Sequence, residues 1–143
     1  MQSLTTEIFV LCDYAMVSRE QTLSILGIFD QFFVTDLPTS WPKMFLVAVL
    51  VGDAGKEYDI LLKLTPPQET DQSFPDKELK VALGPNGRAN LITELVNFPL
   101  PLTGTYKVEI LTEGQKVGGL EFKVNKTTPT YQGQDLQGNK VGN

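Results

Sequence analysis

Carboxylates and two aromatic side chains are the residues of this chain whose type and spacing could support chemistry. Asp13 and Asp30 each interrupt an apolar run, and a chain reversal between the runs could bring the two side chains together. Two adjacent carboxylates can share a proton, act as acid and base, or hold a cation. The alternative is that each faces solvent or accepts backbone N–H bonds at a bulge. We therefore keep both residues as candidate binding residues and assign no catalytic residue.

A second acidic group, Asp53, Glu57 and Asp59, surrounds an expected hairpin. Loops of β-sandwiches can bind Ca²⁺ through such carboxylates and nearby carbonyl groups. The spacing departs from the calcium-loop pattern D-x-[DN]-x-[DN]-G, and Lys56 lies inside the group. We expect a solvated acidic hairpin with no metal or other cofactor. A metal site formed by these three carboxylates is the alternative.

Trp41 and Phe74 are the aromatic candidates, and each lies beside a proline in an expected loop. An exposed ring in such a place can stack on a sugar or anchor a protein contact. The alternative is that both rings close the open ends of the fold. We keep both as candidate binding residues.

Composition removes many enzyme classes. The 143 residues contain no histidine and one cysteine, Cys12. A Ser–His–Asp triad, a Cys–His pair and a histidine-ligated metal therefore cannot be built. Cys12 has no disulfide partner within the chain and lies in an apolar run, where we expect it to behave as a buried hydrophobic residue.

Charge and hydropathy indicate an acidic, soluble, cytoplasmic protein. There are 12 basic and 17 acidic residues, for a net charge of −5, and no three consecutive basic residues. This pattern does not favour binding to nucleic acid or to an anionic membrane. The longest apolar run, 44–51, is far shorter than the ~20 residues that span a bilayer, and the N-terminus lacks the basic start of a signal peptide.

Periodicity predicts β-strands along most of the chain. Four segments alternate apolar with charged residues, as half-buried antiparallel strands do: 58–64, 79–83, 106–110 and 120–124. Three segments are apolar on both faces and are expected to be central strands: 8–16, 23–34 and 44–51. An eighth strand is expected near 90–98.

Turn and proline signals separate these strands. Ser18–Gln21 is expected to reverse the chain, and Gly84–Gly87 to close a hairpin. Segments 37–42, 65–75 and 98–101 are rich in proline and are expected to cross between sheets or cap their ends. Gly104 and Tyr106 are typical of a tyrosine corner. The sequence thus predicts an all-β antiparallel sandwich of seven to eight strands, with a closed barrel as the alternative.

Domain organisation is expected to be simple. Residues 1–124 have the length and apolar content of one domain, whereas 125–143 are mainly polar and small. We predict a single sandwich domain and a flexible C-terminal tail. A tail that orders on a partner is the alternative.

Several short motifs together resemble a known family. They are the segments 11–15 and 23–30, Trp41-Pro42 before an apolar strand, and 104–108. The chain resembles a family of small uncharacterised bacterial all-β proteins, a domain of unknown function, over most of residues 8–124. The resemblance implies a β-sandwich and implies no activity.

Three functions remain open. The first is a non-catalytic module that binds another protein, or itself as a homo-oligomer, through a sheet edge or through Trp41 and Phe74. The second is a carbohydrate-binding module that uses the same rings. The third is an enzyme that uses Asp13 and Asp30. The missing catalytic groups favour the first, so we do not expect an enzyme.

Overall fold

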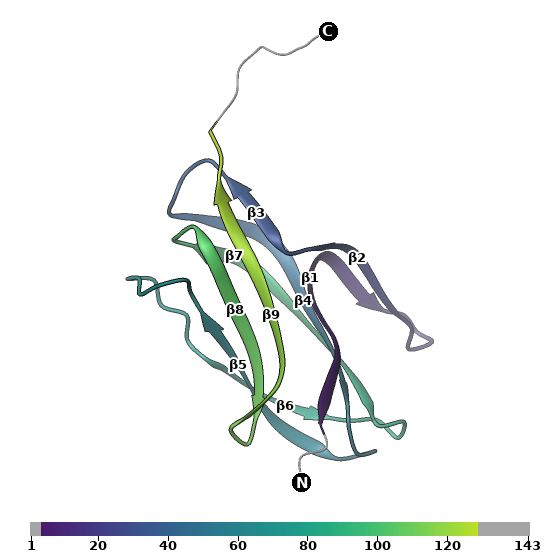
Figure 1. Ribbon diagram of the computed structural model, residues 1–143. Helices are drawn as coiled ribbons and strands as arrows, with labels where there is room; N and C mark the ends of the chain where they lie inside the picture. The colour runs from purple at the N-terminus through teal and green to yellow at the C-terminus, as the bar shows by residue number, and fades with distance from the viewer. Residues whose placement is uncertain (1–3, 129–143) are drawn as a thin grey trace, which may run out of the picture.

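The chain folds into nine strands and no helix within residues 4–128, the part that the computed structural model describes (Figure 1). The predicted pattern of alternating strands is confirmed, and the nine strands exceed the upper expected number, eight, by one. The strands are β1 (Thr5–Val17), β2 (Leu23–Phe29), β3 (Gln31–Val34), β4 (Thr39–Val51), β5 (Glu57–Thr65), β6 (Lys77–Ala82), β7 (Arg88–Leu100), β8 (Gly104–Thr112) and β9 (Gln115–Lys126).

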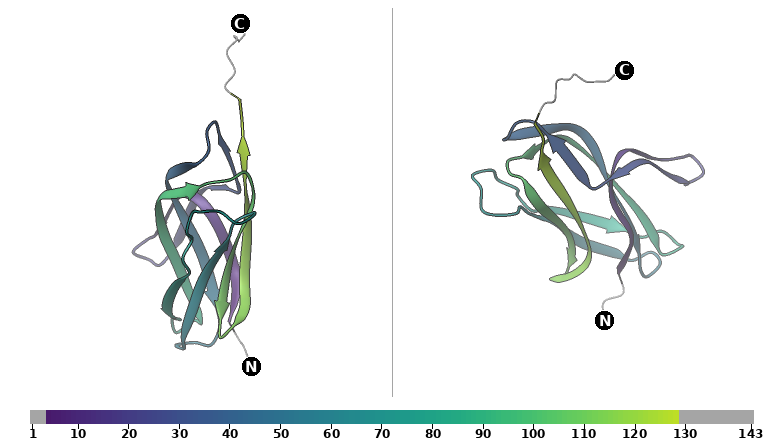
Figure 2. Two further views of the ribbon diagram at one scale, coloured as in Figure 1. Left: turned by 90° about the vertical axis from the view of Figure 1, so that its left-hand side faces the viewer. Right: turned by 45° about the horizontal axis from the view of Figure 1, so that its top comes forward.

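The strands form two sheets that pack face to face, as the left view of Figure 2 shows. The first sheet has the order β2-β1-β4-β7, and the second has the order β3-β9-β8-β5-β6. All neighbours are antiparallel except β3 and β9, which are parallel. The predicted sandwich is confirmed, and the alternative of a closed barrel is wrong because the two sheets keep separate edges.

The additional strand arises from a break at Asp30. The sequence predicted one strand over 23–34, but β2 belongs to the first sheet and β3 to the second. The backbone carbonyl of Asp30 accepts a hydrogen bond of 2.9 Å from the N–H of Lys123 in β9. The chain therefore changes sheets at Asp30, and both halves of the predicted central strand become edge strands.

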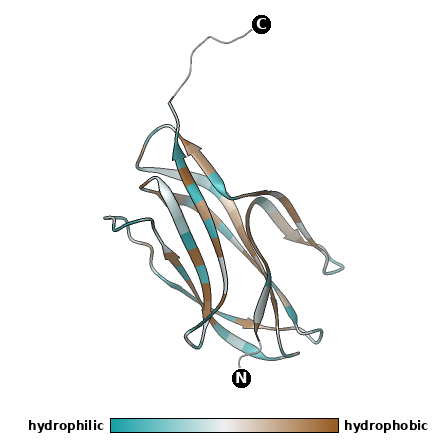
Figure 3. Ribbon diagram, in the orientation of Figure 1, coloured by the Kyte–Doolittle hydropathy of each residue, from teal (hydrophilic) through white to brown (hydrophobic). Residues whose placement is uncertain are grey.

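The main core lies between the sheets. Alternating residues of β4, β5, β8 and β9 fill it, and Figure 3 shows the corresponding alternation of hydrophobic and hydrophilic bands along β8 and β9. Its fully buried members include Phe32, Met44, Tyr106 and Phe122. This core is what the period-two pattern of the sequence encodes.

A tyrosine corner closes one end of the core, as predicted. The hydroxyl of Tyr106 donates to the carbonyl of Leu102 at 2.7 Å and accepts from the N–H of Leu102 at 3.0 Å. The Tyr106 ring stacks on Phe122 with centroids 4.8 Å apart. Tyr106 thus fixes the crossover between β7 and β8, which lie in different sheets.

Two of the three proline-containing segments lie where the chain crosses from one sheet to the other, as predicted, although each lies partly within a strand. Residues 39–42 begin β4, and residues 98–100 end β7. The two segments pair with each other, with Trp41 opposite Phe98 and Thr39 opposite Leu100. β7 is an edge strand, where a proline removes no ladder bond on the outer side. The third segment joins β5 to β6, which are antiparallel neighbours in one sheet, so it is not a crossover between sheets. Its Phe74 packs on the main core, as a cap would.

The Gly84–Gly87 segment makes a tight turn, but it does not close a hairpin ladder. Its flanking strands β6 and β7 belong to different sheets, which corrects the prediction. Gly87 donates its N–H to the carbonyl of Gly84 at 2.9 Å and accepts from the N–H of Gly52 at 2.9 Å. Gly87 has a φ of 75°, and a Cβ there would lie 2.6 Å from the carbonyl oxygen of Gly52. The turn therefore packs closely on the neighbouring loop.

β9 continues to Lys126, two residues beyond the predicted domain boundary. The predicted flexible tail falls largely at 129–143, outside the described residues. Within the described part, no helix is long and apolar enough to cross a membrane.

Candidate functional site

Trp41 and Phe74, the aromatic candidates, both pack on the main core. The Trp41 ring lies 4.8 Å from Phe32 and 6.4 Å from Phe29, measured between centroids. The Phe74 ring lies 6.0 Å from Phe98. Both rings are half-buried, and Trp41 lies in β4 and not in a loop. A binding role for these rings stays a prediction, and their contacts are those of caps on the sandwich.

Asp13 and Asp30 are not brought together by the strand register. Leu11 pairs with Phe29 and Tyr14 with Leu26, so Asp13 lies across from Gly27, three positions along the ladder from Asp30. Three positions along a strand correspond to about 10 Å. Both side chains are exposed. The geometry therefore offers no shared carboxylate site.

The acidic group around the β4–β5 turn also forms no metal centre. Lys80 contacts Asp59 at 3.3 Å and Glu57 at 4.0 Å. Asp53 lies in the turn before β5. Among residues 4–128, no three acidic, cysteine or histidine side chains are grouped as a metal would require.

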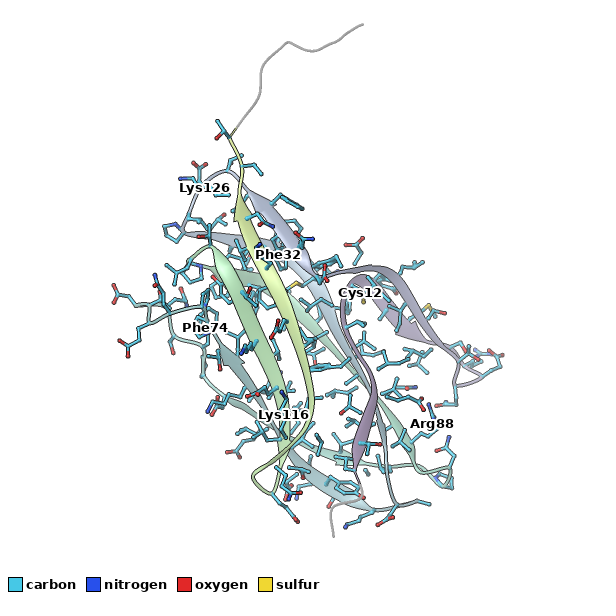
Figure 4. The ribbon with its side chains drawn as sticks, in the orientation of Figure 1. Cys12, Phe32, Phe74, Arg88, Lys116 and Lys126 are labelled. Atoms are coloured by element: carbon cyan, nitrogen blue, oxygen red, sulfur yellow. The ribbon has the colours of Figure 1, made fainter. Side chains whose placement is uncertain are left out.

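Cys12 lies in β1 at the base of the β1–β2 hairpin (Figure 4). Its side chain is fully buried, and burial raises the pKa of the thiol, against a smaller opposing effect of the backbone of Tyr14. The thiol therefore stays protonated at neutral pH and belongs to the hydrophobic packing, as predicted.

Residues 13–28, here called the β1–β2 hairpin, are the part of the molecule that leaves the sandwich. β1 pairs with β4 only as far as Cys12, but with β2 as far as Val17. Gly27 has a φ of 69°, and a Cβ there would lie 2.3 Å from a carboxylate oxygen of Asp13. The hairpin consequently projects from the first sheet, on the side away from the second sheet (Figure 2).

The expected turn at Ser18–Gln21 closes the hairpin. The N–H of Gln21 donates to the carbonyl of Ser18, and the N–H of Ser18 donates to the carbonyl of Thr22, each at 2.9 Å. The Ser18 hydroxyl oxygen accepts from the N–H of Glu20 and of Thr22. These hydrogen bonds are all local to the turn, and they define its conformation.

One face of the hairpin packs on the outer face of the first sheet. Ala15, Leu23 and Ile25 take part in a second hydrophobic cluster. The buried members of that cluster also include Cys12, Phe45 and Val47. Residues of β4 that face away from the main core are therefore apolar because the hairpin covers them. This explains why β4 is apolar on both faces.

The hairpin also carries apolar side chains that are exposed to solvent. Tyr14 pairs with Leu26, Met16 is two residues from Tyr14, and Ile28 is two residues from Leu26. We call these four residues the hairpin patch. Leu26 and Ile28 are each 62% exposed, and Tyr14 and Met16 are 47% and 43% exposed. Four of the large exposed hydrophobic residues of the described chain thus belong to this hairpin, and the Tyr14 ring also contacts Phe45 of β4, with centroids 5.4 Å apart.

The free edge of the first sheet at β2 has no charge or proline. Natural edge strands are normally blocked by such residues or by being short. The other edge strands follow this rule: β7 carries Arg88 and Glu94, β6 carries Lys77 and Lys80, and β3 has four residues. In Figure 3, β2 is pale to brown and only its turn is hydrophilic. β2 is therefore an unprotected edge in the described structure.

A groove separates the hairpin tip from the outer face of the first sheet. It has a volume of about 980 Å³. Val17, Leu23 and Ile25 line it from the hairpin, and Ile8 and Val49 line it from the sheet. Arg88 at one end (Figure 4) forms an ion pair with Glu7, and this pairing lowers the pKa of Glu7. The amide side chains of Gln21, Asn86 and Asn90 also line the groove, and Arg88 is the one charged residue among the described residues of its lining.

Sequence reasoning interpreted 23–34 as a central strand because it is apolar on both faces. The structure instead places Leu23–Phe29 at the edge of the first sheet, with Leu26 and Ile28 largely exposed. Periodicity alone could not tell whether such a strand is central or at an edge.

Comparison with known proteins gives a family. A model of a family of unknown function, DUF6941, matches residues 7–125. The chain belongs to this family. The resemblance drawn from the sequence motifs is thereby confirmed. No curated protein matches the DUF6941 chain.

Solved structures share the fold of this DUF6941 protein at low identity. An alkylpurine DNA glycosylase from Pseudomonas fluorescens, bound to DNA with an abasic site analogue, is 11% identical, with a TM-score of 0.54 over 86% of this chain and 30% of that one. A β-glucosidase from Listeria innocua in complex with isofagomine is 11% identical, with a TM-score of 0.50 over 88% and 16%. The chain spans less than a third of either protein. These likenesses show the sandwich fold alone.

Proposed function

We propose that this DUF6941 protein is a non-catalytic protein-interaction module and that the β1–β2 hairpin is its binding element. The observation that carries the proposal is the uncharged β2 edge with Leu26 and Ile28 largely in solvent. Exposed strands of this kind bind partners by adding a strand to the sheet. Large exposed apolar side chains beside such an edge supply the contact area.

The position of the hairpin supports this role. Its inner face is fixed to the sheet through Ala15 and Ile25, so the patch is presented on a supported element. Its turn carries Arg19 and Glu20, which keep the tip hydrated. A supported strand loses little conformational entropy on binding, which favours affinity.

Site-specific photocrosslinking tests the proposal. A photoreactive amino acid replaces Leu26 in one variant and Val96 in the matched control. Val96 is 61% exposed and lies in β7, at the opposite edge of the same sheet. After irradiation of the protein in extract and in pure solution, we expect specific adducts from position 26 and none from position 96.

The adducts distinguish an interaction module from a surface without a partner. A discrete adduct from position 26, with another protein or with the same chain, supports the interaction module. Equal labelling from both positions, or none from position 26, contradicts it. Leu26→Ser and Val96→Ser variants give the second measurement, because the first should reduce adduct formation from position 28 and the second should not.

A further inference from the structure

The main core contains a cavity of about 160 Å³ between the two sheets. Both sheets contribute to its lining, which is mostly apolar and includes Met44, Leu46, Leu62, Leu95, Val108 and Phe122. Protein cores contain few voids larger than a water molecule, so a cavity of this volume is an uncommon feature. An apolar cavity of about 150 Å³ stays dry and can hold a molecule of the size of benzene. The volume therefore fits an apolar group of about six carbon atoms.

The cavity opens at one side of the sandwich, where β6 and β7 are the edge strands of their sheets. The exposed residues Lys63, Pro75 and Lys77 belong to the lining, so they mark the mouth. Pro75 comes from the loop that carries Phe74 (Figure 4). Because β6 and β7 are not paired with each other, a small molecule can enter between them without breaking a strand ladder.

Two polar side chains at this mouth occupy positions that face the core. Lys77 of β6 pairs with Leu62, and Thr93 of β7 pairs with Leu46. Directly paired residues share one face of a sheet, and both leucines belong to the main core. Lys77 and Thr93 are therefore directed to the inner faces of the two sheets, and both line the cavity.

These two side chains offer hydrogen-bond donors that the described chain does not use. Among residues 4–128, the Lys77 ammonium group has no ion pair and the Thr93 hydroxyl has no hydrogen bond. A carboxylate only accepts hydrogen bonds, and an ammonium group and a hydroxyl group both donate them.

We infer that the cavity is a binding site for a small monocarboxylic acid. The apolar body of the acid, about six carbon atoms, occupies the cavity between the sheets. Its carboxylate stays at the mouth and accepts hydrogen bonds from the Lys77 ammonium group and the Thr93 hydroxyl. This site is separate from the β1–β2 hairpin and does not depend on the proposed function.

NMR of methionine methyl groups tests the inference in the full-length protein. Of the three methionines, Met44 lines the cavity and Met16 lies in the β1–β2 hairpin, so Met16 reports binding elsewhere on the surface. Benzoate and hexanoate are the probes, and benzamide is the uncharged match of benzoate. We expect a saturable shift of the Met44 signal, a dissociation constant of about 0.1–1 mM, and no shift of the Met16 signal. Benzamide should bind at least about fivefold more weakly than benzoate, because it brings no charge to Lys77.

Four variants separate the charge of the mouth from the shape of the cavity. Lys77→Met should weaken benzoate binding at least about fivefold and leave benzamide binding unchanged. Thr93→Val should weaken benzoate binding about threefold, because it removes one donor. Lys80→Met is the matched control in the same strand, since the Lys80 ammonium group pairs with Asp59 and does not line the cavity. Leu95→Phe fills the cavity and should abolish the binding of both compounds.

Three results would overturn the inference. The first is a Met44 signal that does not move at about 10 mM of either acid. The second is a Met16 signal that shifts with the same affinity as Met44, because the acid would then bind the surface. The third is unchanged benzoate affinity in Lys77→Met, because Lys77 would then only protect the edge of β6 from pairing.

Two measurements keep these outcomes distinct. Urea unfolding shows whether each variant is folded, and the comparison of benzoate with benzamide tests the charge in the wild-type protein without any substitution. Equal affinity of the two compounds for the wild type contradicts a carboxylate site. Crosslinking from position 26 is measured separately, so failure of this inference leaves the proposed function standing.

Discussion

Removing the hydroxyl group of Tyr106 tests whether the tyrosine corner stabilises the sandwich. Tyr106 is fully buried, and its hydroxyl makes two hydrogen bonds to the backbone of Leu102. Tyr106→Phe removes both bonds and keeps the ring, so its stacking on Phe122 is preserved. The substitution therefore isolates the bonds that fix the β7–β8 crossover.

The expected loss follows from these two bonds. Each hydrogen bond contributes about 0.5–1.5 kcal/mol net, and half-buried groups of Leu102 lose their partner. We expect the free energy of unfolding to fall by about 2 kcal/mol. For a domain of this size the midpoint of thermal unfolding should fall by about 8 °C.

Urea unfolding followed by tryptophan fluorescence measures this change, since Trp41 is the one tryptophan of the sequence. Tyr14→Phe is the control, because Tyr14 is exposed and we expect a change below about 0.5 kcal/mol. A loss for Tyr106→Phe that equals that of the control would refute the reasoning, because the corner would then contribute nothing to stability.

The pKa of Tyr106 leads us to expect that the free energy of unfolding falls at alkaline pH. Burial raises the pKa of Tyr106, and the bond to Leu102 opposes this only in part. The folded state thus binds the phenolic proton more tightly than the unfolded state does. The resulting stability is full below the ordinary pKa of tyrosine, near 10, and is lost as pH rises through the raised pKa. Tyr106→Phe should flatten this alkaline loss, and an unchanged pH profile would contradict the assignment.

Three further predictions concern single sites. Trp41→Ala should lower the free energy of unfolding by about 2–3 kcal/mol in urea, because the ring packs on the core; weaker association with unchanged stability would instead make Trp41 a binding anchor. Gly87→Ala should destabilise more than Gly55→Ala, although both have positive φ, because only the former meets a backbone oxygen, at 2.6 Å. Equal decreases in the midpoint of thermal unfolding for Gly87→Ala and Gly55→Ala would rule out that close contact. Cys12 should react with a thiol reagent at pH 8 only when denaturant is added, and rapid native reaction would disprove its burial.

Local patterns accounted for most of the fold. The alternation in 58–64, 106–110 and 120–124 encodes a side-chain period of two, and the structure has β5, β8 and β9 there. The corner of Tyr106 and the turn at Ser18–Gln21 were also predicted, because a turn depends on a few neighbouring residues. The absence of histidine excluded several catalytic designs through composition alone.

The surroundings of the candidate residues were harder to predict than the strands. The sequence proposed Trp41, Phe74, Asp13 and Asp30, yet the rings pack on the core and the carboxylates lie three register positions apart. Register between strands depends on long-range pairing, which the local pattern of either strand does not contain. The residues that now carry the proposal, Leu26 above all, were treated as part of a buried strand.

The sequence by itself determined the class of fold, the strand rhythm and the lack of histidine-based chemistry, because these follow from residue types and short spacings. Tertiary structure alone decided that the chain changes sheets at Asp30 and that β2 becomes an edge. An apolar strand is equally compatible with the centre and the edge of a sheet. Which of the two occurs depends on how strands distant in the sequence pair, and here that pairing exposes the apolar hairpin.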